Sequence, residues 1–356
     1  MSVHILGIGA MGMLLAHEVF LAGLKPVLLV KHHAVQQHLQ ALNNSMTLAR
    51  HRDSGVSYHT TKMAVRQKPT ASARGLEISD LVVATKTYST KEALAPYMPY
   101  ITPKTNLVFL QNGMGVVPNA VEELWHGRSL PRLFHIISTH GAYKERVNLT
   151  HHVGQGSLTI AEIPWRTGSV AGLDAGLAPS NLPEVIEALL RSLNLNTSVA
   201  PYPEFLVTQM EKLVVNACIN PISALMDCRN GDLLHSTHCI SMMKKVISEC
   251  VECFKTDSNV FSVVPEASTI LSRERLLQCV LDVCQKTSEN SSSMREDLRD
   301  GKMTEIDAIN GHIVQLGAKT GVATPLNKTF CTMVSARHQI ARVKENPMLA
   351  GAFGSY

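Results

Sequence analysis

The chain has 356 residues, of which 45% are apolar and 17% are charged, and its formal net charge is +4. This length favours two domains, and the composition is that of a globular protein rather than a fibrous or disordered one. The small positive charge would suit an anionic ligand but is too diffuse to predict nucleic-acid binding. No run of about 18 apolar residues occurs, so no membrane-spanning helix is expected.

The N-terminal segment "SVHILGIGAMG" enters a strand pattern directly. It lacks the charged region and cleavage site of a secretory signal and the Arg/Ser-rich composition of a transit peptide. We therefore expect a cytoplasmic protein.

Short aliphatic runs alternate with helical patterns over the first part of the chain. Strands are expected at residues 3–9, 25–32, 80–87, 105–113, 132–143, 148–164 and 196–203. A helix is expected at 10–23, closed by Gly23, and another at 185–193 after a loop or insertion at 170–184. Continuous apolar strands separated by helices predict a parallel sheet with helices on both faces.

Amphipathic helical patterns replace the strands after residue 203. Apolar residues recur with a spacing of 3.6 over residues 205–226, 240–256, 272–287 and 303–321. We therefore expect an α/β domain at residues 1–202 and a helical domain at 203–356, with the boundary within "APYPEF".

A glycine motif follows the first expected strand. "GIGAMG" comprises Gly7, Ile8, Gly9, Ala10, Met11 and Gly12, in GxGxxG spacing. The first glycine permits a tight turn, the second lets a pyrophosphate approach the backbone, and the third allows close helix–strand packing. Because the motif joins a strand to a helix that leads to a second strand, it predicts dinucleotide binding rather than a structural turn.

The end of the second strand carries Lys31, within "VKHH", where NAD-binding proteins carry an acid. An ammonium there would attract the 2′-phosphate of NADPH, with help from His32 or His33, whereas a carboxylate would repel it. NADPH is therefore favoured over NADH, the alternative being a solvated strand end. Lys86 and Asn112 follow two further strands and lie where ligands of open α/β sheets bind, unless they are surface turn residues.

A polar row interrupts the first long helix of the second half. Lys212, Asn216 and Asn220 are four residues apart in "MEKLVVNACINPISAL" and therefore share one face of a helix. The apolar residues between them favour a polar site in a core over a solvated face.

All eight cysteines follow residue 217. Cys250 and Cys253 have CxxC spacing, but a zinc site would need a second ligand pair at matching spacing, which is not evident. We expect free thiols that pack between helices, and no metal.

Together these motifs resemble those of the ketopantoate reductase (2-dehydropantoate 2-reductase) family, over nearly the whole chain. The resemblance rests on "GIGAMG", "LQNGMG", "THGA" and "GQG", and above all on "KLVVNACINPISAL" and "SSSMREDLRDGKMTEIDAINGHIV". It implies an α/β Rossmann-type N-terminal domain and an all-α C-terminal domain like that of 6-phosphogluconate dehydrogenase. The extra length around residues 160–200 and the cysteine-rich second half depart from the family pattern.

The resemblance also implies roles for individual residues. The catalytic lysine of the family matches Lys212, and the acid of "TEID" matches Glu305. Residues implied to bind substrate are Asn112, Asn216, Asn220, Asn290 and Ser293, and those implied to bind the cofactor beside the glycine loop are Lys86, Asn112 and Glu305.

The implied reaction is reduction of ketopantoate to (R)-pantoate by NADPH, in pantothenate and coenzyme A synthesis. Reduction of a 2-oxo acid needs a hydride at the ketone carbon and a proton donor at the developing alkoxide. Lys212 would be that donor, and Glu305 would favour its charged form. The substrate is expected between the two domains, and a homodimer is one candidate assembly.

Alternatives remain open for these residues and for the function. "TEID" is also a capping-box pattern, and Ser293 with Glu296 fits S-x-x-E, so both segments could simply begin helices. The asparagines could be polar helix packing. The chain could reduce another bulky 2-oxo acid, or be a non-catalytic relative that acts as a binding module.

Overall fold

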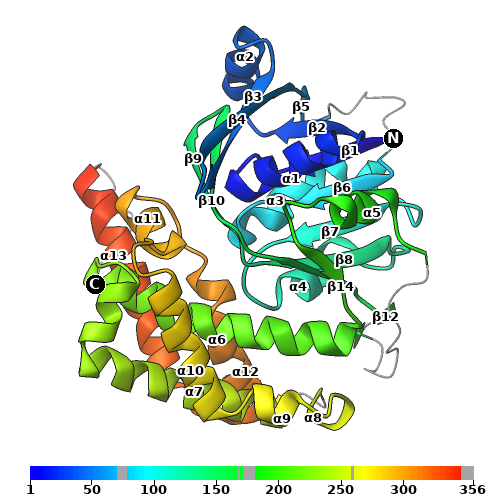
Figure 1. The fold of residues 1–356 in the computed structure, drawn as a ribbon. Coiled ribbons are helices and arrows are strands. Elements are labelled where there is room, and N and C mark those ends of the chain that lie inside the picture. Colours follow the sequence, from blue (N-terminus) through cyan, green and yellow to red (C-terminus); the bar gives the residue numbers. More distant parts are fainter. Residues whose placement is uncertain (70–77, 167–168, 171–180, 258–259, 346–356) are drawn as a thin grey trace. The chain divides into compact units, whose positions relative to one another are not determined.

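The computed structural model describes residues 1–69, 78–166, 169–170, 181–257 and 260–345 (Figure 1). The chain forms two compact units, Met1–Gln111 with Val116–Phe205, and Asn112–Gly115 with Leu206–Tyr356. Most of the loop expected at 170–184 lies outside the described residues.

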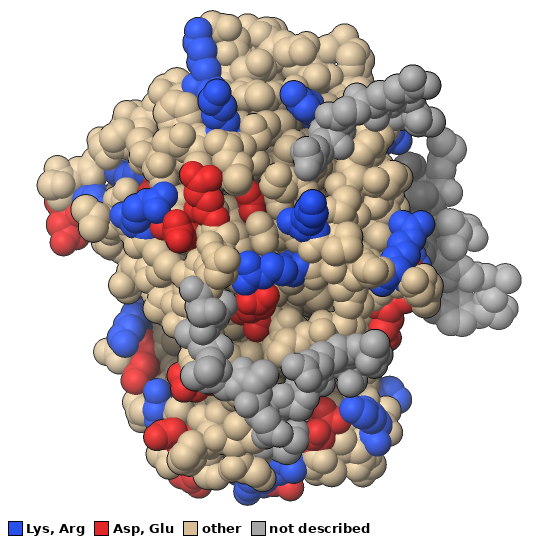
Figure 2. Space-filling view, turned by 90° about the vertical axis from the view of Figure 1, so that its right-hand side faces the viewer, with Lys and Arg blue, Asp and Glu red and all other residues tan. Residues whose placement is uncertain are grey.

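None of the helices in the described ranges has both the length and the apolar character needed to cross a membrane. On the face drawn in Figure 2, basic side chains are interspersed with acidic ones.

The first unit is built on an eight-stranded sheet in the order β14-β11-β8-β7-β6-β1-β2-β5. Its strands are β1 Ser2–Leu6, β2 Lys25–Val30, β5 Ala64–Gln67, β6 Asp80–Val83, β7 Asn106–Leu110, β8 Arg132–Ser138, β11 Leu158–Glu162 and β14 Thr197–Val199. Neighbouring strands are parallel except β8 and β11. The chain passes from β1 to β2 on one side and later reaches β6 on the other, which makes β1 a topological switch point.

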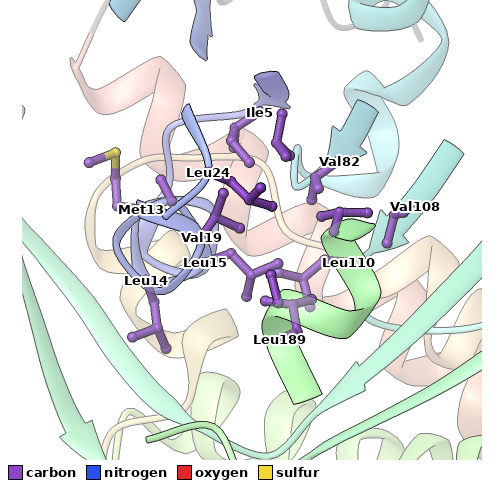
Figure 3. Close-up of a cluster of buried hydrophobic side chains, with 14 of the residues drawn as sticks. Ile5, Met13, Leu14, Leu15, Val19, Leu24, Val82, Val108, Leu110 and Leu189 are labelled. Atoms are coloured by element: carbon purple, nitrogen blue, oxygen red, sulfur yellow. The ribbon is translucent and has the colours of Figure 1, made fainter. Parts of the chain in front are cut away.

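Helices cover both faces of this sheet, as the continuous apolar strands predict. Val82 packs with helices α1 (Ala10–Leu21) and α5 (Glu184–Arg191) in one hydrophobic cluster (Figure 3). Its neighbours Leu81 and Val83 belong to a second cluster, with α3 (Thr90–Leu94) and α4 (Val116–Leu124). Since successive strand residues point to opposite faces, the two clusters lie on opposite sides of the sheet. The α/β prediction for the first half is confirmed.

A second sheet, in the order β4-β3-β10-β9, was not predicted. Its strands are β3 Ser45–Arg52, β4 Gly55–Lys62, β9 Gly141–Arg146 and β10 Leu149–Gly154. Outside the two sheets, the unit also contains α2 His33–Ala41, the short strand pair β12 Trp165–Arg166 and β13 Ser169–Val170, and the 3₁₀ turns η1 Thr87–Ser89 and η2 Ala95–Tyr100. The segments 132–143 and 148–164 contain strands, as expected, but each segment divides between the two sheets. The division occurs where Thr139 and Ser157 hydrogen-bond to each other, the Ser157 N–H donating to Thr139 Oγ1 over 2.8 Å.

A buried ion pair joins α1 to this second sheet. Arg50 of β3 donates to the carboxylate of Glu18 on α1, and both side chains are at most 5% exposed. Ser192 and Asn194 also donate to Glu18. The carboxylate is therefore compensated by several donors, as a buried charge must be.

The second unit is helical, as predicted. It contains α6 Tyr202–Met226, which begins in the first unit, η3 Gly231–His235, α7 Thr237–Asp257, α8 Val260–Val263, α9 Ala267–Ile270, α10 Arg273–Lys286, α11 Ser293–Arg299, η4 Ile306–Ala308, α12 Asn310–Thr320 and α13 Pro325–Glu345. The helices expected at 205–226, 240–256 and 272–287 are confirmed. The continuous helix expected at 303–321 is wrong, because Ile309 leaves the helical region (φ −106°, ψ −91°) and the Ala308 carbonyl accepts from Met114 N–H over 3.0 Å.

All eight cysteines are free thiols, as expected. Cys250 and Cys253 lie buried on α7, and the Cys253 thiol donates to the carbonyl of Ile313 on α12 over 3.9 Å. Burial raises the pKa of Cys253 to about 11, so this thiol stays protonated at neutral pH.

Pro221 lies inside α6 and has no N–H to offer the carbonyl of Ala217, four residues earlier. Asn310 at the start of α12 replaces it, since its Nδ2 donates to the Ala217 carbonyl over 3.1 Å. The same amide donates to Asn327 Oδ1 over 2.9 Å, and Asn327 Nδ2 donates to Glu249 over 2.7 Å. The backbone hydrogen bond that α6 lacks at Pro221 is thus replaced by one from the fully buried side chain of Asn310.

Asn310→Ala should lower the free energy of unfolding by about 1–3 kcal/mol, because it leaves the buried Ala217 carbonyl without that donor. In a Pro221→Ala background, residue 221 supplies its own N–H to the Ala217 carbonyl. Asn310→Ala should therefore lower the free energy of unfolding by less in that background. Urea unfolding followed by circular dichroism measures both costs. Equal costs in the two backgrounds would show that Asn310 does not compensate for the proline.

Candidate active site

The glycine loop lies between β1 and α1. Gly7 has φ +105°, and a Cβ there would lie 2.6 Å from the Ala84 carbonyl carbon, so only glycine fits the turn. A Cβ on Gly12 would clash with the Gly7 carbonyl oxygen. In contrast, a Cβ on Gly9 would have nothing within 4 Å, which leaves that part of the backbone open to a ligand.

The surroundings of this loop fit the pyrophosphate of a dinucleotide. Gly9 is the N-cap of α1 and provides no side-chain cap, and the first turn of the helix carries no acid. The helix dipole and its unsatisfied N–H groups therefore favour an anion. Ile8 and Met11 pack partly against the core, Ala10 begins the helix, and the loop follows the switch-point strand β1.

Lys31 directly follows β2 and is exposed, with its Nζ 3.0 Å from a carboxylate oxygen of Glu92 on α3. Two residues later, His33 Nδ1 accepts a 2.7 Å hydrogen bond from Gln67 Nε2 at the end of β5. Lys86 lies three residues beyond β6, and its carbonyl accepts the Ser89 N–H over 3.0 Å. Lys31 and Lys86 thus lie at the carboxyl edge of the sheet, on opposite sides of β1.

Three of the expected site residues are joined by hydrogen bonds in the second unit. Lys212 Nζ on α6 donates to Asn112 Oδ1 over 3.0 Å, and Asn112 Nδ2 donates to Glu305 Oε2 over 3.3 Å. Glu305 is only 6% exposed. One amide thereby binds a cation with its oxygen and a carboxylate with its nitrogen, although the three residues are 93 to 193 positions apart in the chain.

The Asn112–Gly115 segment is held by backbone contacts as well. Gln209, one turn before Lys212, donates to the Gly113 carbonyl over 3.2 Å, a contact that sequence patterns did not reveal. Gly113 has φ +80°, and a Cβ there would clash with Ala308. The glycine of the Asn-Gly pair is therefore required by close packing and not only by a surface turn.

Burial lowers the pKa of Lys212 from its usual 10.5 to about 8, while the charge of Glu305 acts in the opposite direction. Desolvation disfavours the ammonium, and the nearby carboxylate restores part of its stability. A lysine with this pKa is still mostly protonated at pH 7 but releases its proton more readily than an exposed lysine does. These are the properties of a general acid near neutral pH.

Asn216 and Asn220 lie on α6 after Lys212, and all three side chains are partly exposed. The residues between them are buried, at 213–215 and 217–219. The row is therefore a polar strip at the edge of a core and not a fully solvated face.

The segment of Asn290 and Ser293 is fastened to α6 by its neighbour Ser292. Ser223 Oγ on α6 donates to Ser292 Oγ over 2.7 Å, and both residues are buried. Asn290 and Ser293 themselves are exposed. The idea that Ser293 caps its helix is wrong: Ser292 has the extended backbone of an N-cap, and its hydroxyl accepts the Arg295 N–H over 3.2 Å.

The capping-box alternative for "TEID" is likewise not what the structure contains. Glu305 precedes a short 3₁₀ turn and forms no side-chain cap there. Thr304 Oγ1 accepts the Ile306 N–H over 3.4 Å, and the Glu305 carboxylate is directed to Asn112 instead.

Two family models match the chain: "Ketopantoate reductase PanE/ApbA" over residues 3–165 and "Ketopantoate reductase PanE/ApbA C terminal" over 204–338. The chain belongs to the ketopantoate reductase family. It is 33% identical to a "Probable 2-dehydropantoate 2-reductase" of Schizosaccharomyces pombe, with 96% of this chain and 98% of that protein covered. It is 30% identical to a "2-dehydropantoate 2-reductase" of Saccharomyces cerevisiae, with 96% and 95% covered.

Solved structures agree on the fold. D-mandelate dehydrogenase, solved with NADH and anilino(oxo)acetate, matches with a TM-score of 0.72 at 19% identity, over 96% of this chain and 99% of that one. The resemblance noted in the sequence motifs is thus confirmed at the level of family and fold.

The pKa of Lys212 leads to a pH prediction. If Lys212 is the proton donor, kcat/KM for the 2-oxo acid should fall as the pH rises through about 8, where the ammonium is lost. Glu305→Gln removes the charge that raises this pKa, so the alkaline limb should move to lower pH.

Glu211→Gln is the matched control, since Glu211 adjoins Lys212 in sequence but pairs with Arg275 over 3.3 Å. The alkaline limb of the pH profile of kcat/KM should lie at the same pH in Glu211→Gln as in the parent. A Glu305→Gln profile identical to that of the parent would exclude Glu305 as the charge that supports the lysine.

Proposed function

We propose that this chain catalyses the NADPH-dependent reduction of 2-dehydropantoate to (R)-pantoate, in pantothenate and coenzyme A synthesis. The observation that carries the proposal is the hydrogen-bonded set of Lys212, Asn112 and Glu305 in a member of the ketopantoate reductase family. The two yeast relatives carry this activity in their names. The family membership thus supplies the reaction, and the geometry supports the residues that perform it.

Lys212 acts on the ketone oxygen of the substrate. Bound NADPH supplies the hydride for the C2 carbon. The Lys212 ammonium stabilises the negative charge that develops on the oxygen and then donates its proton, as general acid. Asn112 orients the ammonium through its amide oxygen, and Glu305 favours the protonated form of the lysine.

The remaining polar residues suit the rest of the substrate. Ketopantoate has a carboxylate and a terminal hydroxyl, and asparagine amides both donate and accept hydrogen bonds. Asn216 and Asn220, on the face of Lys212, and Asn290 with Ser293 are proposed to bind these groups. Asn112 and Glu305 are also proposed to contact the cofactor, together with the glycine loop, Lys31 and Lys86.

Lys212→Ala should reduce kcat/KM for ketopantoate by about 10²- to 10⁴-fold, the usual contribution of general acid catalysis. The assay follows NADPH oxidation with ketopantoate beside a panel of bulky 2-oxo acids. Lys245→Ala, an exposed lysine on α7, controls for the loss of one charge and should be fully active.

Full activity of Lys212→Ala would refute the general acid. Faster turnover of another 2-oxo acid would favour the alternative of a different reductase. Binding of NADPH without turnover of any member of the panel would favour the non-catalytic relative.

The cofactor preference rests on Lys31. Its exposed pair with Glu92 contributes little to stability, so the lysine can exchange that partner for a 2′-phosphate. Lys31→Glu should weaken NADPH binding about 10- to 100-fold, the range of a charge-assisted hydrogen bond, and NADH binding much less. Fluorescence titration measures both. Glu92→Gln is the control and should not weaken NADPH; equal weakening of both cofactors by Lys31→Glu would contradict the assignment.

The domain assignment and the setting are proposed as follows. Residues 1–202 are the NADP-binding domain, and residues 203–356 are the catalytic domain. The buried free thiols support a reducing compartment such as the cytoplasm. A homodimer is proposed as one candidate assembly.

A further inference from the structure

Lys144 of β9 reaches the glycine loop of the dinucleotide motif. Its Nζ donates to the carbonyl oxygen of Ile8 over 2.9 Å, although the two residues are 136 positions apart in the chain. The side chain is partly buried. No sequence motif marked this lysine, which follows "THGA" by two residues.

The strand geometry explains why Lys144 and not its neighbours makes this contact. Tyr143 and Glu145 both turn to His151, Tyr143 stacking on its ring at 4.7 Å and Glu145 accepting a 2.7 Å hydrogen bond. Successive side chains of a strand point to opposite faces, so Lys144 points the other way, to the loop before α1.

The contact sets the direction of one cofactor-facing amide. The peptide between Ile8 and Gly9 is planar and trans, so its C=O and N–H point in opposite directions. When Lys144 holds the Ile8 carbonyl, the Gly9 N–H is directed away from β9. Gly9 is the N-cap position whose surroundings are open, and its N–H is one of those available to a phosphate.

We propose that Lys144 is a positioning residue for the pyrophosphate of the cofactor: it fixes the Ile8–Gly9 peptide and places a positive charge beside the loop. This inference rests on the proposed dinucleotide function. Lys31 and Lys144 then serve different parts of the cofactor, the 2′-phosphate and the pyrophosphate respectively. A positive charge near a preorganised anion site strengthens the binding of the anion. Lys144 would do so without contacting the reacting carbon.

Two cofactor fragments separate these roles. Isothermal titration calorimetry of the full chain uses 2′-phospho-ADP-ribose, which contains the pyrophosphate, and adenosine 2′-monophosphate, which lacks it. Lys144→Met should weaken the first about 10-fold and change the second less than twofold. Lys31→Met should weaken both. Lys144→Arg, which keeps a charged donor, should bind both fragments nearly as the parent does.

Lys62→Met is the matched control, since Lys62 is an exposed lysine at the end of β4 in the same sheet and its loss changes the net charge equally. It should bind both fragments like the parent. In turnover assays Lys144→Met should raise KM for NADPH and leave kcat nearly unchanged.

Three outcomes would overturn the inference. Lys144→Met could bind 2′-phospho-ADP-ribose as tightly as Lys62→Met does, which would remove any role in binding. It could weaken both fragments alike, which would indicate general loss of structure. If the parent binds neither fragment, the proposed cofactor is wrong and the inference falls with it.

Discussion

The carboxamide of Asn112 is the group on which the hydrogen-bonded set of Lys212, Asn112 and Glu305 depends. Its oxygen accepts from the Lys212 ammonium and its nitrogen donates to the Glu305 carboxylate, so both ends of one rigid planar group are used. The reverse orientation would place like partial charges against each neighbour. The amide therefore holds the ammonium and the carboxylate apart at a fixed distance. With a pKa of about 8, Lys212 is protonated at neutral pH but loses its proton more readily than an exposed lysine does.

Backbone contacts outside these three side chains maintain their spacing. Gly113 packs against Ala308, and the Ala308 carbonyl receives the Met114 N–H, which brings the segment after Asn112 to the segment after Glu305. On α6, Asn310 satisfies the carbonyl that Pro221 leaves open, so the helix that carries Lys212 continues past the proline. In both places the contact is made to a backbone carbonyl, of Ala308 or of Ala217, that accepts no hydrogen bond from a regular helix at that point.

Sequence patterns predicted much of this arrangement because much of it is locally encoded. The apolar runs, the 3.6-residue spacing and the glycine loop each follow from nearby residues, and the family motifs singled out Lys212, Asn112 and Glu305. The failures have long-range causes. The helix break at Ile309 depends on Met114, the second sheet pairs β3 with a strand about 100 residues later, and the Ser292 cap is fixed by Ser223. The Lys144 contact similarly joins residues that no periodicity connects.

The assignment of Asn112–Gly115 to the helical unit has a consequence for dissecting the protein. The chain passes between the two units after Gln111, after Gly115 and after Phe205, so no single cut separates them. A fragment that begins at residue 206 would contain both Lys212 and Glu305 but would lack the amide that lies between them. Such a fragment could be a well-packed helical body and still leave its lysine and carboxylate without their shared partner. In this fold the helical unit is not a contiguous piece of the chain.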